Sequence, residues 1–204
     1  MKKVILALSL AAIGFTATQA MADEAQSPWM VRVRAVNISP ANGSDPIGGV
    51  GPADLITVSS KTIPEVDISY FVTPNWSAEL ILTYPQKHDV ALAGTTIGSF
   101  KELPPTLTAQ YHFAPDAKVN PYLGAGINYT RISDQNLPLG LTLDNNSVGL
   151  ALQAGVDFKL DKNWSLNLDI KKFQLRSDVS VAGVKISSVK VDPLLVGVGV
   201  GYRF

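Results

Sequence analysis

The sequence predicts an all-β fold, an eight-stranded antiparallel transmembrane β-barrel with short periplasmic turns and long extracellular loops. Apolar and polar residues alternate with a period of two along most of the chain, which is the pattern of a strand with two unlike faces. The segments that connect these stretches are short and long in turn, which is the sidedness of a barrel in the outer membrane.

The first 22 residues have the features of a cleaved signal peptide. The basic start MKK precedes the apolar run VILALSLAAIGF, and the small residues AMA (20–22) come directly before Asp23. This run is too short to span a bilayer as a helix. We therefore expect residues 1–22 to be removed on export and residues 23–204 to form a single barrel domain.

The composition limits the kinds of partner. Lys2 and Lys3 leave with the signal peptide, so the 17 basic and 17 acidic residues become 15 and 17. A nucleic-acid partner normally requires a basic surplus on one face, so none is expected. The chain contains no cysteine, which excludes disulfides and thiolate metal sites. We predict neither a metal nor a cofactor.

Eight segments carry the alternation, each close to the roughly 9 to 11 residues with which a tilted strand crosses a bilayer. They are WMVRVRAVNIS (29–39), IPEVDISYFV (63–72), WSAELILTYP (76–85), PPTLTAQYHF (104–113), PYLGAGINYTRI (121–132), SVGLALQAGVDFKL (147–160), WSLNLDIKKF (164–173) and VDPLLVGVGVGYRF (191–204).

One face of every segment is free of charge, as shown by Trp29, Val31 and Val33 in the first. A charge facing lipid at mid-membrane would cost about 2 to 4 kcal/mol, so this face suits lipid. A soluble sandwich would bury the same face, and parity alone leaves both folds open. The connections favour the barrel, because 73–75, 114–120 and 161–163 are short whereas 40–62, 86–103, 133–146 and 174–190 are long.

Aromatic residues gather beside the short turns and the C-terminus, where a periplasmic girdle is expected. This set comprises Trp76, Tyr111, Phe113, Tyr122, Phe158, Trp164, Tyr202 and Phe204. The triplet Asn-Trp-Ser occurs at 75–77 and again at 163–165, and we interpret each copy as a turn followed by a girdle tryptophan. The C-terminal VGVGVGYRF, which ends in Phe204, resembles the signal that the outer-membrane assembly machinery reads.

Four stretches resemble the OmpW family of outer-membrane proteins, namely LPPTLTAQYHF, PYLGAGINYT, AGVDFKLDKNWSLNLDIKKF and VDPLLVGVGVGYRF. The resemblance implies an eight-stranded barrel in the outer membrane of a Gram-negative bacterium. It also implies passive uptake of small hydrophobic molecules with a lateral exit into the membrane. An apolar inward residue is expected at Ile81, as the family has. One member has an inward Trp where this chain has Lys171, so no aromatic gate is predicted there.

The inward face predicts a floor of paired charges. Five basic and five acidic residues have inward parity, namely Arg32, Arg34, Lys159, Lys171 and Arg203 with Glu65, Asp67, Glu79, Asp157 and Asp169. A balanced set can pair internally and leaves no ring of one sign to select ions, so we predict poor ion conductance. We expect the lumen to be lined by Ile81, Thr83, Asn128, Asp169 and Lys171. Inward glycines either open a passage or make room for long side chains, and both alternatives stay open.

The long connections are unusually apolar for loops. GGVGPADLITV, VALAGTTIGSF, NLPLGLTL and VSVAGVKI alternate in part, as if strands continued above the membrane around a dry mouth. Such a mouth would favour a hydrophobic solute by about 0.8 kcal/mol per buried CH₂. The alternative is that these loops pack on one another or on lipopolysaccharide. Pro104 and Pro105 cannot donate to a strand ladder, so they mark a candidate lateral seam.

Two functions follow as hypotheses. The first is passive uptake of small hydrophobic solutes through the barrel. The second is a non-transporting receptor or structural barrel whose loops bind phage, toxins or host surfaces. Enzymatic activity is not predicted, because the two histidines, His88 and His112, fit polar packing better than catalysis.

Overall fold

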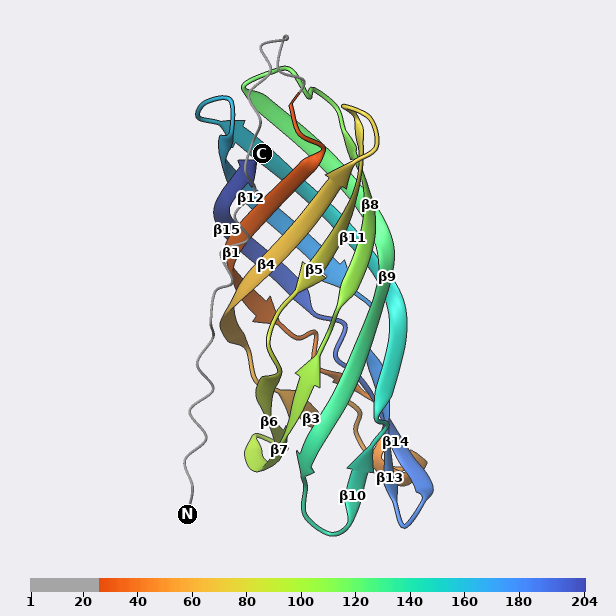
Figure 1. Ribbon diagram of the computed structural model, residues 1–204. Coiled ribbons are helices and arrows are strands. Elements are labelled where there is room, and N and C mark those ends of the chain that lie inside the picture. Colours follow the sequence, from red (N-terminus) through yellow and green to blue (C-terminus); the bar gives the residue numbers. More distant parts are fainter. Residues whose placement is uncertain (1–25) are drawn as a thin grey trace, which may run out of the picture.

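The computed structural model describes residues 26–204, so the predicted signal peptide lies outside the described residues. Within this range eight long antiparallel strands form a closed barrel (Figure 1). They are β1 (Trp29–Ser39), β4 (Lys61–Phe71), β5 (Trp76–Leu82), β8 (Thr106–His112), β9 (Val119–Asn136), β11 (Asn146–Lys159), β12 (Trp164–Phe173) and β15 (Leu194–Arg203). The pairing of β15 with β1 closes the wall and confirms the predicted fold class. Residues 26–204 contain no helix that is both long and apolar enough to cross a membrane.

Prolines explain where the strands depart from their predicted ends. The strand expected to reach residue 85 ends at Leu82, and the strand expected from residue 104 begins at Thr106. Pro85, Pro104 and Pro105 lie in the gaps, where their missing N–H groups cannot continue a ladder. The strand β9 is longer than expected because its outer half extends beyond the membrane wall and pairs with an extracellular strand.

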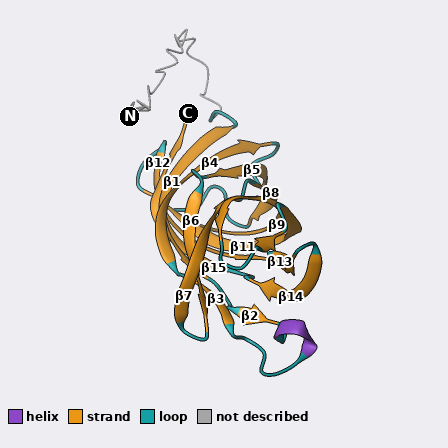
Figure 2. Ribbon diagram, turned by 90° about the horizontal axis from the view of Figure 1, so that it is seen from below, coloured by secondary structure: helices purple, strands orange, loops and turns teal. Residues whose placement is uncertain are grey.

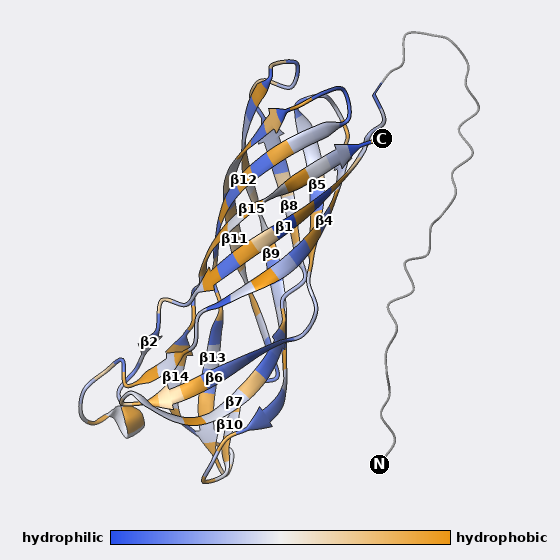
Figure 3. Ribbon diagram, turned by 90° about the vertical axis from the view of Figure 1, so that its left-hand side faces the viewer, coloured by the Kyte–Doolittle hydropathy of each residue, from blue (hydrophilic) through white to orange (hydrophobic). Residues whose placement is uncertain are grey.

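The outer surface of the barrel is apolar. Leu107, Ile127 and Val198 point outward and are more than half exposed. Figure 3 shows apolar and polar residues alternating along the barrel strands. Within the eight barrel strands, exposed charges on this face lie at the extracellular ends, for example Arg131, so the outer limit of the membrane lies on the periplasmic side of them.

The periplasmic girdle is built from aromatic rings that face each other across neighbouring strands. The opposed pairs are Trp29–Tyr70, Trp76–Tyr111 and Trp164–Tyr202. Their ring centroids lie 4.8 to 5.0 Å apart in edge-to-face geometry. The prediction that Tyr122 belongs to this girdle is wrong. Its side chain is 1% exposed inside the barrel, because its parity places it on the inward face of β9.

The two Asn-Trp-Ser copies perform the same structural task. Asn75 accepts a backbone hydrogen bond from His112 N at 2.7 Å and donates its side-chain amide to His112 O at 2.7 Å. Asn163 makes the same pair of bonds to Arg203, at 2.8 and 2.6 Å. Each asparagine therefore ties a periplasmic turn to the next barrel strand, directly before a girdle tryptophan.

The long connections fold into strands that form an extracellular head. The strands β7 (Thr95–Leu103), β6 (Gln86–Leu92) and β3 (Ile56–Val58) extend the sheet from the outer half of β9. A second sheet has the order β10 (Leu141–Leu143), β13 (Arg176–Val181), β14 (Val184–Lys190) and β2 (Gly43–Ser44), and a short 3-10 helix, η1 (Ile47–Gly49), follows β2. This extracellular head lies at the bottom of Figure 1, and Figure 2 shows the molecule from the same end.

Buried apolar residues from both sheets and from the segments beside them meet in a cluster that we call the head cluster. It comprises Ile56, Val58, Val90, Phe100, Ile132, Leu175, Val179, Val189 and Val191. The hairpins β6–β7 and β13–β14 turn at Ala93-Gly94 and Ala182-Gly183. All four residues have positive φ, as the tightest hairpin turns require. The apolar loops of the sequence thus enclose an apolar core above the membrane.

We expect Gly199→Ala to destabilise the barrel by about 1 to 3 kcal/mol, the usual cost of overpacking. A Cβ at Gly199 would lie 2.1 Å from Val33 O on the neighbouring strand, so β1 and β15 would have to separate. Urea unfolding in lipid vesicles, followed by tryptophan fluorescence, measures the effect. The matched control is Gly197→Ala, whose nearest contact would be the Val36 side chain at 3.1 Å. Equal stability of the two variants would contradict this account.

Candidate functional site

The inner surface of the described chain changes character from the periplasmic to the extracellular end. Along β1, inward Met30 is followed by inward Arg32 and Arg34, and then by inward Val36 and Ile38. The charged level, here called the floor network, comprises Arg32, Arg34, Glu65, Asp67, Glu79, Asp157, Asp169 and Lys171. The apolar level above it, here called the middle layer, comprises Val36, Ile38, Ile63, Ala151, Phe173 and Leu195. The head cluster lies beyond.

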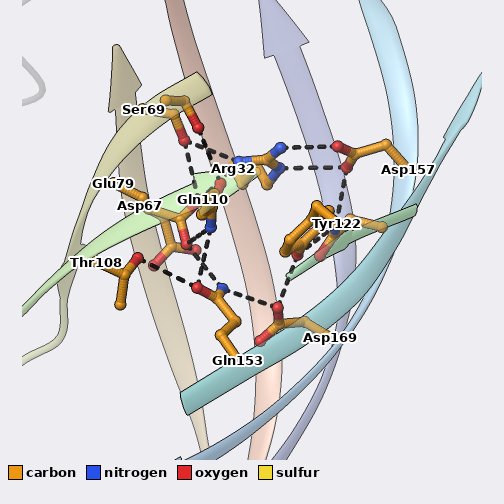
Figure 4. Close-up of polar contacts among 12 residues, drawn as sticks. Arg32, Asp67, Ser69, Glu79, Thr108, Gln110, Tyr122, Gln153, Asp157 and Asp169 are labelled. Atoms are coloured by element: carbon orange, nitrogen blue, oxygen red, sulfur yellow. Dashed lines mark hydrogen bonds and ion pairs between the residues drawn. The ribbon is translucent and has the colours of Figure 1, made fainter. Parts of the chain in front are cut away.

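Arg32 joins opposite sides of the barrel. Its guanidinium donates to Glu79 Oε2 on β5 at 2.7 Å and to both carboxylate oxygens of Asp157 on β11, at 2.7 and 3.2 Å. It also donates to Ser69 Oγ at 2.8 Å. The side chain is fully buried, and Figure 4 shows it at the centre of these contacts. The planar guanidinium of arginine carries N–H donors that point in different directions, so one arginine can bind two carboxylates on different strands.

Arg34 and Lys171 form the next part of the floor network. Arg34 donates to Asp67, to Asn167 Oδ1 at 2.6 Å and to Tyr122 Oη at 3.2 Å. Lys171 lies between two carboxylates, with Glu65 Oε1 at 2.6 Å and Asp169 Oδ1 at 2.7 Å. Lys171 is therefore an ion-pairing residue at the position where the resemblance would allow an aromatic gate.

Neutral donors supplement the basic residues. The floor network, as the described residues form it, has three basic and five acidic members. Tyr122 Oη donates to Asp169 at 2.7 Å, and Gln153 bridges Glu79 and Asp169 at 2.9 and 2.8 Å. Each acidic residue thus has an ionic or hydrogen-bonding partner inside the barrel, as a buried charge requires, although one oxygen of Asp67, Oδ1, has no hydrogen-bond partner among the described residues.

The structure places Lys159 and Arg203 outside the floor network. The Lys159 ammonium binds the carbonyl of Pro115 in a periplasmic turn. The Arg203 guanidinium lies 3.9 Å from the Phe71 ring centroid and donates to Ser27 O. Both residues have inward parity, but they lie at the periplasmic ends of their strands, closer to the periplasm than the floor network.

The inward glycines make room for the floor network. A Cβ at Gly155 would lie 2.4 Å from the Tyr122 ring, and one at Gly199 would lie 2.8 Å from Arg34 Cγ. The space beside these glycines is therefore filled by neighbouring side chains. Of the two alternatives left open by the sequence, room for long side chains fits this part of the barrel.

The other residues expected to line the lumen lie higher. Ile81 is 3% exposed on the inner face, and Asn128 is 1% exposed and donates to Thr106 Oγ1 at 2.7 Å. Thr83 lies outside the strand, half-buried, where its hydroxyl donates to Pro64 O at 3.1 Å. Thr83 thus lies at the outer edge of the wall, where its hydroxyl also accepts a hydrogen bond from the buried Gln86 side chain at 3.3 Å.

The wall has a break at the level of Thr83. The ladder of β5 and β8 ends at the pair Ile81–Thr106, and the ladder of β6 and β7 starts at Gln86–Glu102. Between them lie residues 83–85 on one side and Pro104-Pro105 on the other, and neither stretch belongs to a strand. The candidate seam at Pro104 and Pro105 therefore coincides with an interruption of the wall.

The head cluster encloses small cavities. A cavity of about 20 Å³ is lined by head-cluster residues, with Glu102 and Ser177 as its polar members. A cavity of about 50 Å³ has an entirely apolar lining that includes Leu92, Ile97 and Leu137. These volumes accommodate about one to a few water molecules. The cavities inside the apolar head are thus small.

Comparison with known proteins identifies the family. The family model described as OmpW matches residues 26–204. The chain belongs to the OmpW family. An uncharacterized outer-membrane protein, y4mB, of Sinorhizobium fredii is 45% identical over 187 residues, which cover 87% of this chain and 80% of the relative. Outer membrane protein W of Escherichia coli is 30% identical, and the match covers the full length of both chains.

A solved OmpW-like barrel has the same architecture. The crystal structure of the outer membrane protein OprG from Pseudomonas aeruginosa superposes with a TM-score of 0.77 at 27% identity, and covers 88% of this chain and 97% of that one. The protein described here is thus an OmpW-family barrel of the Gram-negative outer membrane.

Sequence reasoning missed the neutral members of this OmpW-family interior. Tyr122, Gln110, Gln153 and Asn167 all hydrogen-bond to charged residues of the floor network. Their inward parity was a usable signal, because each alternates with apolar outward neighbours. Parity predicts whether a side chain points into the barrel, but it does not predict which side chain it will contact there.

We expect Glu79→Gln to lower the free energy of unfolding by about 3 to 5 kcal/mol, because it leaves Arg32 partly unpaired in a buried site. Glu79 accepts bonds from Arg32, Gln110 and Gln153, and an amide would turn one acceptor atom into a donor. Urea unfolding in lipid vesicles measures the change. The control, Lys101→Met, removes the exposed ion pair with Asp134 and should cost less than about 1 kcal/mol. Equal costs would contradict a buried role for Glu79.

Proposed function

We propose that this barrel takes up small hydrophobic solutes passively through the head and releases them sideways into the membrane. The observation that carries the proposal is the order of layers inside the molecule. The apolar head cluster lies at the extracellular end, and the charged floor network lies nearer the periplasm. The resemblance to the OmpW family, which led to the same expectation from sequence, supports it.

The head cluster supplies the attraction for an apolar solute. Its residues are buried although they lie above the membrane, and transfer of each CH₂ group of a solute from water to such a site contributes about 0.8 kcal/mol. The present cavities are too small for such a solute. Entry therefore requires strands of the head to separate, and the ladder of β2 with β14, which has two residue pairs, is the shortest ladder in the described head.

The floor network opposes passage straight through the barrel. Its charges are held by short hydrogen bonds across the interior, and an apolar solute would have to break them without replacing any. The break at Pro104 and Pro105 lies between the head and the floor, so a lateral exit avoids that cost. The same network should give the barrel poor ion conductance.

A disulfide between β2 and β14 should block uptake. Ser44 and Val189 are opposite partners in that ladder, and opposed residues lie about 4.5 to 5.5 Å apart, within the range that a disulfide spans. We expect oxidised Ser44→Cys/Val189→Cys protein to reduce uptake of naphthalene to the level of cells that lack the barrel, and a reductant to restore it. The chain has no other cysteine, and the single variants are the controls.

The lock also separates the two candidate functions. Equal uptake by the oxidised and reduced forms would contradict entry through the head. Failure of every form, wild type included, to exceed cells without the barrel would favour a receptor whose loops bind a surface.

Replacing Pro104 and Pro105 with valine should slow uptake several-fold. The variant removes the two prolines that precede β8, so the ladder of β8 can extend by two residues and close the exit; Pro105 O already accepts from Tyr129 N on β9, so the new N–H group toward the break comes from position 104. The control is Pro121→Val, which adds an N–H group on β9 at the periplasmic end, away from the break. Initial uptake rates measured in cells with equal amounts of folded barrel test the idea, and an unchanged rate would count against a seam here.

A further inference from the structure

Three buried polar side chains lie at the base of the head cluster. Gln86, His88 and Glu102 are 0%, 1% and 4% exposed, and Gln86 is the partner of Glu102 across β6 and β7. Their neighbours Lys87 and Asp89 point outward into water, which places the group above the membrane. The group follows directly on the break in the wall, since Pro85 precedes Gln86 and Pro104 follows Glu102 by two residues.

The hydrogen bonds of Gln86 leave its carbonyl oxygen free. The amide nitrogen donates to Tyr84 O at 2.9 Å and to Thr83 Oγ1 at 3.3 Å. A carbonyl such as Tyr84 O can only accept, so the orientation of the amide is settled. The other atom, Gln86 Oε1, is buried and has no hydrogen-bond partner in the described part of the chain.

Glu102 has a free oxygen as well. His88 donates from Nδ1 to Ser59 O at 2.9 Å, and its Nε2 lies 3.4 Å from Glu102 Oε1. Burial alone would lower the pKa of His88, but the adjacent Glu102 raises it above its usual value, despite an opposing effect from Lys61. One carboxylate oxygen of Glu102 thus faces the His88 ring. No group within residues 26–204 binds the other oxygen, Glu102 Oε2.

Glu102 also faces the cavity of about 20 Å³. The other polar residue of that lining, Ser177, already accepts a hydrogen bond from Asp144 N at 3.1 Å. A native protein rarely leaves a buried acceptor without a partner. In the described interior the cavity therefore combines an apolar lining with a carboxylate oxygen that needs a donor.

We propose that Glu102 forms a subsite, at the base of the head cluster, for the hydroxyl group of an otherwise apolar solute, such as a long-chain alcohol. This names the solute class of the proposed function and rests on it. The hydroxyl donates to Glu102 Oε2 in a charge-assisted bond, and the hydrocarbon part packs in the head cluster. A charged ammonium is a poorer occupant, because it would lose its hydration in the apolar head.

The two histidines make the subsite observable. Full-length mature protein in lipid nanodiscs, labelled with ¹⁵N-histidine, gives imidazole signals from His88 and His112 alone. We expect 1-octanol to shift the His88 signals in a saturable way. The methyl ether 1-methoxyoctane has a similar chain but no donor, and should leave them unchanged. His112 lies at the periplasmic end, bonded to Ser77 and Asn120, and serves as an internal reference.

Variants assign the effect to the carboxylate. Glu102→Leu should raise the apparent Kd of 1-octanol about tenfold or more, the factor expected for a lost hydrogen bond to a charged group. Asp89→Leu removes a carboxylate from the outer face beside His88 and should leave the Kd unchanged. The wild-type comparison of alcohol and ether stands even where Glu102→Leu fails to fold.

The outcomes separate the subsite from uptake. Equal shifts of the His88 signals with alcohol and ether would overturn the subsite. The absence of a shift with either compound would also overturn it, and this is the result expected if only water binds Glu102. Uptake of naphthalene, measured independently in cells, would then still support the proposed function. Saturable binding of 1-octanol without any uptake would support the subsite and overturn transport.

Discussion

The rest of the structure depends on one constraint, that a strand in lipid can carry charge only on its inner face. Eight strands enclose little more than the volume of their own inward side chains, so the inward charges must satisfy one another. Arg32 and Arg34 do this from β1 by reaching β4, β5, β9, β11 and β12. Because these partners lie on strands from all around the wall, the closed barrel is what brings the charges of the floor network together with the groups that neutralise them.

The sequence pattern predicts the membrane-spanning strands of the wall, but it does not predict which inward side chains contact one another. Strict parity and the contrast of short and long connections predicted eight strands, their faces and most of the floor network. Tyr122 lies close to a turn, as a girdle residue would, but its parity on β9 places it inside the barrel. Lys159 and Arg203 have the right parity, but their depth along the barrel depends on strand register, which alternation does not encode. Gln86, His88 and Glu102 lie in a long connection whose strands were not predicted residue by residue, so their shared inward face emerged only from the structure.

The two ends of the interior have opposite chemistry, and in the proposed function this gives the path of a solute a preferred direction. A solute that gains free energy by entering the head loses it at the floor, where strong polar contacts would have to be replaced. The polar group at the base of the head lies between these environments and beside the interruption in the wall. Its position suits recognition of the polar end of a solute while the apolar end is still surrounded by the head.

The interruption at residues 83–85 and 104–105 has a further consequence, for sequence change. Because no ladder crosses it, the hairpin of β6 and β7 is joined to the barrel below by non-strand linkers and through its pairing with β9. Insertions or exchanges in that hairpin need not shift the register of β5 or β8. The head can therefore diversify as a separable module, while the membrane wall beneath it keeps the same alignment of lipid-facing and inward residues.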